Sequence, residues 1–314
     1  MRIAKNTLKA SVAVGLMLCT FEAHAAGAPR CSGEMELRLT APQASQGSLI
    51  LAEIRSRRAL RDVTGKWGDR SVYFWKVNQT PTVRRGSNVE RRQGLLGVDL
   101  ENAPGTYELS VAATMDDGEQ AGCTARLVVT AGKFATENLR VEKQFVEPNE
   151  QQADRAMADQ QKLRQLFDHV TPERLWQGPF RFPLNDIKRG TNFGKRRVLN
   201  GQSRSPHTGA DFPAPTGTPV HATQSGRVVL AEELYFSGNT VILDHGLGIY
   251  SLYGHLSSID VAVADSVKVG TVLGKVGATG RVTGPHLHWG VTVNKARVDP
   301  VRLVSLFQRI QFKR

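Results

Sequence analysis

Turn-forming residues interrupt almost every apolar run in this chain, and this feature constrains the fold more than any other. From Pro179 to Pro300, glycine, proline and asparagine separate short runs that are rich in β-branched residues. Runs of about four to eight residues between turns are typical of strands, whereas a helix needs a longer periodic segment. The only helix expected in this half covers residues 300–307, so the C-terminal half is predicted to be nearly all antiparallel β.

The N-terminal half shows the same pattern of short apolar runs separated by turns. Met35, Leu37 and Leu39 alternate with charged residues, as in a half-buried strand. Further short runs follow at 48–54, 71–77, 95–100, 106–113 and 125–130, with a turn signal at Asp116-Asp117-Gly118. Six or seven strands in about 100 residues favour a β-sandwich, immunoglobulin-like in type, over residues 26–133.

A connector over residues 134–172 is expected to contain one amphipathic helix of about 20 residues. Asn149 offers a cap at its start, and Pro172 stops the pattern. Its apolar stripe is predicted to pack on a neighbouring domain; the residues of that stripe are Ala153, Ala156, Met157, Leu163, Leu166 and Val170. A third unit, residues 173–314, follows the connector.

The first 25 residues read as a secretory signal peptide. A basic start is followed by an apolar run from Ala10 to Cys19 and then by Ala23-His24-Ala25. The run is shorter than the roughly 20 apolar residues that a spanning helix needs, so no stable membrane insertion is expected. The chain is therefore predicted to be secreted across the inner membrane and to reside in the periplasm.

Cleavage after Ala25 would leave two cysteines, Cys31 and Cys123. In an exported protein such a pair suggests a disulfide, although two unrelated buried thiols are the alternative. With no other cysteine left, any metal must be held by His, Asp or Glu.

The net charge of +12 is concentrated in the C-terminal half, where residues 171–314 carry 18 Lys and Arg against 9 Asp and Glu. Such a field favours an anionic polymer as partner. For an exported protein, cell-wall glycopeptide or an anionic envelope surface fits better than nucleic acid. General solubility is the alternative explanation.

Two histidines stand two residues apart in the stretch 281–291, at the start of an expected strand. Side chains at this spacing point to the same face, so His286 and His288 could serve one site. His207 and Asp211, in an extended segment rich in proline and glycine, also share a face. Together with His288 they give two imidazoles and one carboxylate, which suits a catalytic zinc ion with a position left for water.

Two further histidines, His255 and His286, are candidates for catalysis. Each could take a proton from the attacking water, give one to the leaving amine, or hold the developing oxyanion. The other histidines, His169, His221 and His245, are expected to be scaffold or surface residues, and Trp289 is expected to pack in the core.

These motifs resemble the lysostaphin/LytM-like zinc endopeptidases of bacterial cell walls. The likeness covers residues 180–302 and rests on His207-x-x-x-Asp211, on Tyr253-Gly-His-Leu-Ser257 and on Thr283-Gly-Pro-His-Leu-His288. It implies a compact β core with a groove above the metal. It also implies one zinc ion bound by His207, Asp211 and His288, with His255 and His286 acting on the water and the tetrahedral intermediate. The implied substrate is the peptide stem and cross-link of peptidoglycan.

Three hypotheses follow. The leading one is an exported zinc endopeptidase that hydrolyses peptidoglycan cross-links. The second is a catalytically silent peptidoglycan-binding regulator of a partner hydrolase, since some relatives have lost ligands. A non-haem iron oxygenase, which also uses two histidines and a carboxylate, is the third. The N-terminal half is expected either to dock on the groove of the C-terminal unit and restrain it, or simply to position that unit.

Overall fold

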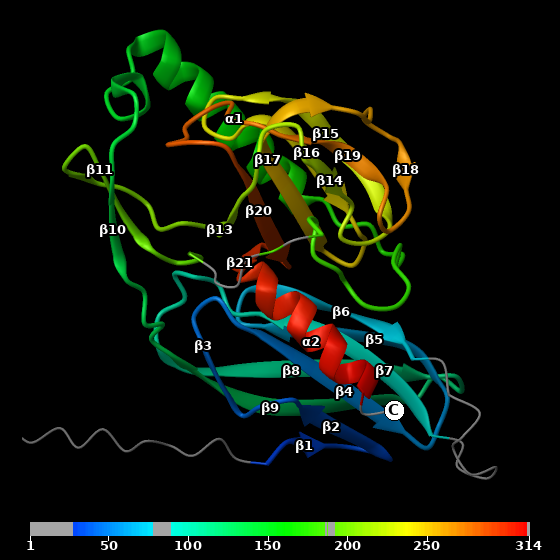
Figure 1. Ribbon diagram of the computed structural model, residues 1–314. Helices are drawn as coiled ribbons and strands as arrows, with labels where there is room; N and C mark the ends of the chain where they lie inside the picture. Colours follow the sequence, from blue (N-terminus) through cyan, green and yellow to red (C-terminus); the bar gives the residue numbers. More distant parts are fainter. Residues whose placement is uncertain (1–27, 78–88, 186, 188–191, 313–314) are drawn as a thin grey trace, which may run out of the picture.

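The computed structural model describes residues 28–77, 89–185, 187 and 192–312 (Figure 1). The predicted signal peptide lies outside the described residues. The chain is mainly β, as predicted, with a strand-rich N-terminal region, a connecting helix and a C-terminal β core. The described helices include none that is both long and apolar enough to cross a membrane.

The N-terminal region is a β-sandwich formed by one continuous path of paired strands in the order β1-β9-β8-β5-β6-β7-β4-β2, with β3 added beside β9. The path folds over on itself, so apolar side chains from both of its ends meet in one core, among them Leu37, Ile54 and Leu109. The strands are β1 (Arg30–Cys31), β2 (Met35–Leu39), β3 (Gln43–Ser45), β4 (Leu49–Ser56), β5 (Leu60–Trp67), β6 (Arg70–Lys76), β7 (Glu90–Gly97), β8 (Gly105–Met115) and β9 (Gln120–Thr130).

The predicted disulfide between Cys31 and Cys123 is present. It joins directly opposed residues of the neighbouring strands β1 and β9. The bridge therefore links the edge strand β1 covalently to its neighbour in the same layer. It closes a loop of 92 residues, and the lost chain entropy of the unfolded state stabilises the fold by roughly 4 to 5 kcal/mol.

The connector contains β10 (Thr136–Leu139), the short 3-10 helix η1 (Lys143–Phe145) and helix α1 (Glu150–Asp168). Asn149 caps α1 in a capping box with Gln152, which explains why the helix begins there. Leu163, Leu166 and Phe167 pack on the C-terminal sheet, so the predicted packing of the helix on a neighbouring domain is correct.

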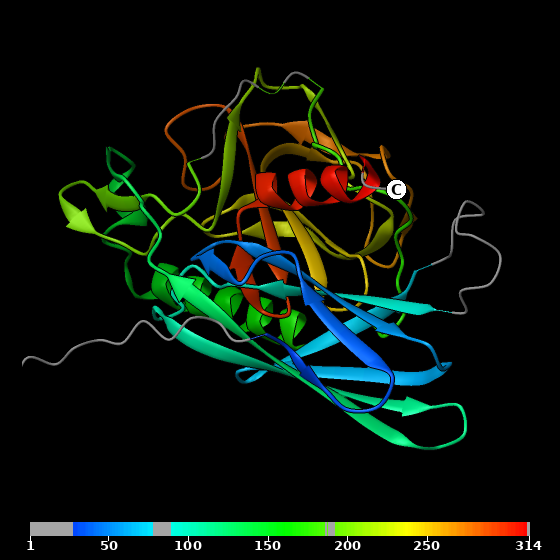
Figure 2. The same cartoon turned by 90° about the horizontal axis from the view of Figure 1, so that it is seen from below.

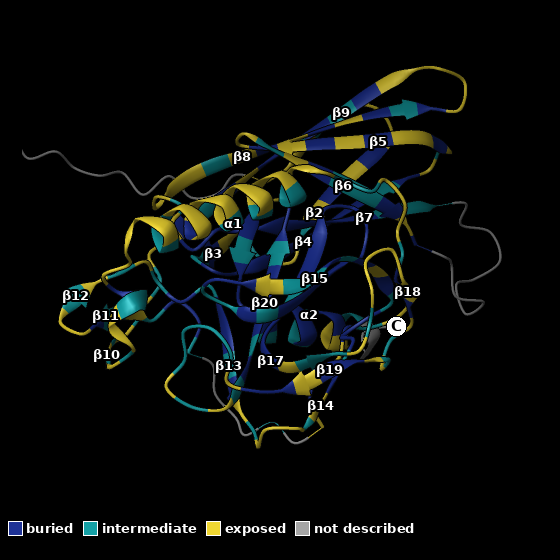
Figure 3. Cartoon of the chain, turned by 90° about the horizontal axis from the view of Figure 1, so that it is seen from above, coloured by how far each residue is buried: buried dark blue, intermediate teal, exposed yellow. Residues whose placement is uncertain are grey.

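Two members of the predicted stripe were wrongly placed. Val170 lies beyond the end of α1 at Asp168. Met157 is 58% exposed, because the face of α1 that meets the sheet is narrower than the periodicity suggested. Figure 3 shows the exposed outer side of α1 above the buried strands of the sheet.

The C-terminal region is a largely antiparallel sheet in the order β13-β20-β17-β16-β15-β18, which β14, β19 and β21 extend. A small separate sheet pairs β10 of the connector in parallel with β11, and β11 with β12. The strands are β11 (Arg196–Leu199), β12 (Gln202–Ser203), β13 (Gly209–Pro213), β14 (Pro219–His221), β15 (Gly226–Leu234), β16 (Gly238–Asp244), β17 (Ile249–Ile259), β18 (Ser266–Val267), β19 (Val272–Val276), β20 (His286–Val293) and β21 (Ala296–Val298).

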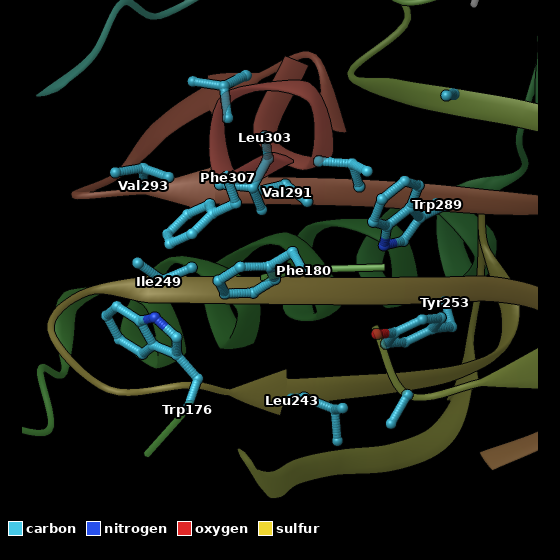
Figure 4. Close-up of a cluster of buried hydrophobic side chains, with 14 of the residues drawn as sticks. Trp176, Phe180, Leu243, Ile249, Tyr253, Trp289, Val291, Val293, Leu303 and Phe307 are labelled. Carbon is cyan, nitrogen blue, oxygen red and sulfur yellow. The ribbon is translucent and has the colours of Figure 1, made fainter. Parts of the chain in front are cut away.

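Helix α2 (Pro300–Phe312) lies between the sandwich and the C-terminal sheet, and it continues beyond the predicted end at residue 307 (Figures 1 and 2). Its side chains Leu303 and Phe307 are buried beside Phe180 and strand β20 (Figure 4). The same hydrophobic cluster takes in Leu49 and Trp75 of the sandwich. The two β regions therefore share a continuous apolar interface.

A buried ion pair crosses this interface. The Asp99 carboxylate, which follows β7, accepts hydrogen bonds from the Arg297 guanidinium at 2.6 and 3.0 Å and from the Arg297 backbone at 2.7 Å. Burial would raise the pKa of Asp99, but the hydrogen bonds from Arg297 outweigh it and lower that pKa below its usual value. The pair therefore fastens β21 to the sandwich in the ionised state.

We expect Asp99→Asn to lower the free energy of unfolding by about 2 kcal/mol at pH 7, because it weakens a charged hydrogen-bonded contact inside the interface. The pKa of Asp99 is lower in the folded state than in the unfolded state, where it is about 4. The stabilisation by the ion pair is therefore fully present above about pH 4, and it is lost as the pH falls through the pKa of the folded state. Urea unfolding of the two proteins at pH 7 and at about pH 3 measures the difference.

The matched control is Glu101→Gln, because Glu101 also pairs with Arg297 but its side chain is 60% exposed. That change should cost less than about 1 kcal/mol. An Asp99→Asn effect that is the same at both pH values would contradict the assigned role of the ionised pair.

Candidate metal centre

The pairing register of three neighbouring strands sets the geometry of the site. Strand β20 lies between β13 and β17, and its residue His288 is opposite both Asp211 and Gly254. Opposed residues of antiparallel strands project to the same side of the sheet. His286, two residues earlier on β20, shares that side and is opposite Pro213. The two histidines therefore face Asp211 together, as their spacing predicted.

Three donor atoms converge in a triangle. His207 Nε2 lies 3.0 Å from Asp211 Oδ1 and 3.0 Å from His288 Nδ1, and these last two atoms are 2.7 Å apart. His207 comes from the segment just before β13. Its ring is held by a hydrogen bond from Nδ1 to the Asn192 carbonyl at 3.1 Å, so its Nε2 presents a lone pair to the triangle.

The chemistry of this donor set fits a divalent cation. Two imidazole nitrogens and a carboxylate oxygen directed at one point repel one another unless a proton or a cation lies among them. Among the described residues, His207, Asp211 and His288 form the group that could hold a metal ion. Zinc is commonly bound by such N and O donors, and a catalytic zinc site keeps one further position open.

Electrostatics keep Asp211 and His207 in the protonation states that a metal requires. Burial would raise the pKa of Asp211, but hydrogen bonds with His207 and His288 outweigh it and hold that pKa well below its usual range. Burial lowers the pKa of His207 to about 4. A carboxylate and a neutral imidazole are both able to bind a cation.

Two residues that were given no role from the sequence hold Asp211 in place. Its second oxygen, Oδ2, accepts hydrogen bonds from Arg197 at 2.7 Å and from the Asn192 amide at 2.9 Å. Asn192 also accepts from the Asp211 backbone at 2.8 Å. The contact of Asn192 with Asp211 could not be read from spacing, because 19 residues separate the two.

Glycine makes room for the third donor. A Cβ at Gly209 would lie 2.7 Å from Cε1 of the His288 ring, which is closer than side-chain atoms approach. Gly209 is opposite Gly290 in the β13–β20 pairing, so the two strands can pack closely there. A larger residue at 209 would push the His288 ring away from Asp211.

The two candidate catalytic histidines lie beside the triangle. The rings of His255 and His286 are 4.8 Å apart, and His255 is 5.8 Å from the ring of His288. Each donates from Nδ1 to a backbone carbonyl at 2.8 Å, Thr279 for His255 and Gly284 for His286. Each Nε2 therefore carries a lone pair, and that of His286 is 3.7 Å from Asp211 Oδ1.

The backbone of His255 adopts a left-handed conformation, with φ of 62°. Residues other than glycine seldom adopt it, and the strain costs of order 1 kcal/mol or more. A hydrogen bond from its backbone N–H to the Ser237 carbonyl at 2.7 Å holds the turn. An irregularity in the pairing of β17 immediately follows, and the kink aims the His255 ring at His286 and His288.

A cavity of about 290 Å³ opens beside the site. Asp211, His255 and His286 line one part of it, and the connector residues Glu137, Leu139 and Val141 line another. Among the described residues, the lining includes none from the sandwich. Strand β10 of the connector therefore narrows the approach to the site, because it pairs with β11 next to Arg197.

Two other sequence expectations concerned scaffold residues. Trp289 is fully buried and packs against Phe182 and Phe212. His245 is also buried, and hydrogen bonds to Ser225 and Ser251 occupy both of its ring nitrogens. Neither side chain reaches the cavity.

Comparison with known proteins agrees with this geometry. Residues 205–300, which contain all five site residues, match the model of peptidase family M23. The chain therefore contains a region that matches peptidase family M23. The sequence resemblance is thereby confirmed, and the family is zinc-dependent.

Individual relatives are similar to part of the chain. Peptidoglycan DD-endopeptidase ShyA of Vibrio cholerae is 39% identical over 124 residues, which are 39% of this chain and 29% of the relative. DD-carboxypeptidase/endopeptidase Mpg of Neisseria meningitidis serogroup B is 44% identical over 95 residues, which are 30% of this chain and 22% of the relative. The chain thus spans less than a third of the length of either curated relative.

One solved structure resembles more of the chain. A crystal structure from Pseudomonas aeruginosa that is named for peptidase M23 superposes with a TM-score of 0.57 at 28% identity. The match covers 85% of this chain and 96% of the other. The similarity therefore extends beyond the M23 domain into the N-terminal half.

We expect Arg197→Gln to weaken zinc binding by about 10- to 100-fold, because it removes the guanidinium that orients Asp211. Competition titration against a chromophoric chelator measures the affinity. Arg196→Gln is the matched control, since the neighbouring Arg196 is exposed and should leave the affinity unchanged. Equal affinities for the Arg197→Gln protein and the unmutated chain would contradict the assigned role.

Proposed function

We propose that this chain is a zinc-dependent endopeptidase that hydrolyses the peptide cross-links of bacterial peptidoglycan. One zinc ion would be held by His207, Asp211 and His288. The observation that carries the proposal is the convergence of these three donors beside two histidines whose free nitrogens face the same cavity. The relatives named as peptidoglycan DD-endopeptidases support the choice of substrate.

The zinc ion, the two histidines and the residues that hold Asp211 would have separate roles in the reaction. Bound zinc supplies a Lewis acid that lowers the pKa of water and polarises a carbonyl group. In hydrolysis the water oxygen bonds to the amide carbon, the C–N bond breaks, and a proton passes to the leaving nitrogen. His255 and His286, each with an Nε2 lone pair in the cavity, would accept that proton, deliver it or stabilise the oxyanion. Arg197 and Asn192 would keep Asp211 oriented throughout.

We further propose a periplasmic location and three functional units: the sandwich at 26–133, the connector at 134–172 and the peptidase domain at 173–314. The basic C-terminal half suits an anionic wall polymer. Restraint by the N-terminal half would act through the connector, because β10 borders the cavity and none of the sandwich residues that the structure describes line it. The substrate stem would then enter between the connector and the loop that precedes β20.

We expect His255→Ala to lower the rate of peptide release from purified sacculi by about 10²- to 10⁴-fold, because a group that transfers protons is lost. Zinc content should not change, since His255 is not one of the three donors. Mass spectrometry of the released fragments gives both the rate and the bond that is cut.

The control for this measurement is His221→Ala, because His221 lies on β14 away from the cavity. A zinc-loaded, unmutated chain that leaves sacculi intact would overturn the proposal. In that case retained binding to sacculi, unaffected by His255→Ala, would favour the silent regulator.

A further inference from the structure

Arg281 lies in the same cavity as the candidate catalytic histidines. It belongs to the loop between β19 and β20, and it lines the cavity together with His255 and His286. Its backbone N–H donates to the Phe236 carbonyl at 2.8 Å, and its guanidinium carbon lies 4.5 Å from the centre of the Phe236 ring. The side chain is therefore held at a fixed place beside the site.

The charged side chains that lie nearest to Arg281 are also positive, so they destabilise its guanidinium cation. Within the described part of the chain, no ion pair or hydrogen bond joins its guanidinium to a carboxylate. Burial and the nearby cations Arg197 and Arg204 lower its pKa to about 10, so it still carries its charge at neutral pH.

The two neighbouring arginines are already engaged. Arg197 donates to Asp211, and Arg204 donates to the Val146 carbonyl and to Gln202. Arg281 therefore has donors to spare. A partly buried guanidinium among like charges is unfavourable by itself, whereas a bound anion would satisfy both its charge and its planar set of donors.

The chemistry of an amide limits which anion of a peptide substrate lies closest to the scissile bond. In an amide, the acyl carboxyl group is the scissile carbonyl, so it offers no free charge before cleavage. On the other side, the carbon that bears the leaving nitrogen can carry a free carboxylate. That carboxylate is the closest anion to the scissile bond that an amino-acid substrate can present.

We propose that Arg281 binds a free α-carboxylate on the carbon that bears the leaving amine, and so makes the enzyme select such amides. This inference rests on the proposed peptidase function and specifies its substrate. Such selection would distinguish two kinds of cross-link. In a direct cross-link between stems, a diamino acid supplies the leaving amine and keeps the free carboxylate on the same carbon. In a peptide bridge, that carboxyl group is instead bonded to the next residue.

The test compares two cross-linked peptide dimers that differ at one group. One carries the free α-carboxylate beside the leaving amine, and the other carries the carboxamide. The zinc-loaded full chain should cleave the carboxylate dimer with the higher kcat/KM. Arg281→Gln should lower kcat/KM by about 10- to 100-fold on the carboxylate dimer and little on the carboxamide, because one charged hydrogen-bonding partner is removed. The preference between the two substrates should then nearly disappear.

Two further variants complete the design. Arg227→Gln, at an exposed position of β15, should change neither rate. Arg281→Lys keeps the charge but loses the planar set of donors, so it should retain part of the preference.

The outcomes separate the two proposals. If the unmutated chain cleaves neither dimer, the peptidase function itself fails. If the unmutated chain cleaves both dimers equally well, Arg281 does not recognise the carboxylate. This outcome is measured on the unmutated chain alone, so it does not depend on whether a variant folds. Equal loss of activity on both dimers in Arg281→Gln would assign Arg281 a structural role instead.

Discussion

The structure of the site depends on the pairing of β20 with β13 on one side and β17 on the other. This register sets Asp211 opposite His288 and brings the β17 segment that carries His255 alongside. Because side chains alternate along a strand, a shift of one residue would turn His286 and His288 to the opposite face. Backbone hydrogen bonds therefore define the donor triangle before any metal binds.

The rest of the molecule holds that register in place. The outer end of β20 and strand β21 rest on the sandwich, where Gly97 lets the backbone of Val293 approach closely. Helix α2 fills the space between the two β regions, and α1 covers the far side of the sheet (Figures 1 and 3). The N-terminal half thus supports the peptidase sheet through a shared core, and within the described part of that half the cavity is lined by connector residues.

Local sequence patterns could predict much of this arrangement. Alternation and turns indicated the all-β halves, the helix start at Asn149 and the apolar spacing indicated α1, and the two-residue spacing of His286 and His288 indicated a shared face. The paired cysteines indicated the disulfide. Each of these features depends on residues that are close in sequence or on one strong chemical preference.

Features that depend on contacts between distant segments could not be predicted. The hydrogen bonds of Asn192 and Arg197 to Asp211 follow from the fold, as does the parallel pairing of β10 with β11. The exposure of Met157 reflects how narrow a stripe of α1 the sheet covers. The left-handed backbone of His255 could not be read from the sequence, since few residues other than glycine adopt it.

The central claim is that His207, Asp211 and His288 form a zinc site with His255 and His286 outside it. Crystallography of the zinc-loaded chain, with anomalous scattering recorded on both sides of the zinc absorption edge, tests it most directly. The account predicts a single zinc peak in contact with His207 Nε2, Asp211 Oδ1 and His288 Nδ1. A peak bound by His255 or His286 in place of one of these donors, or no peak in the triangle, would contradict it.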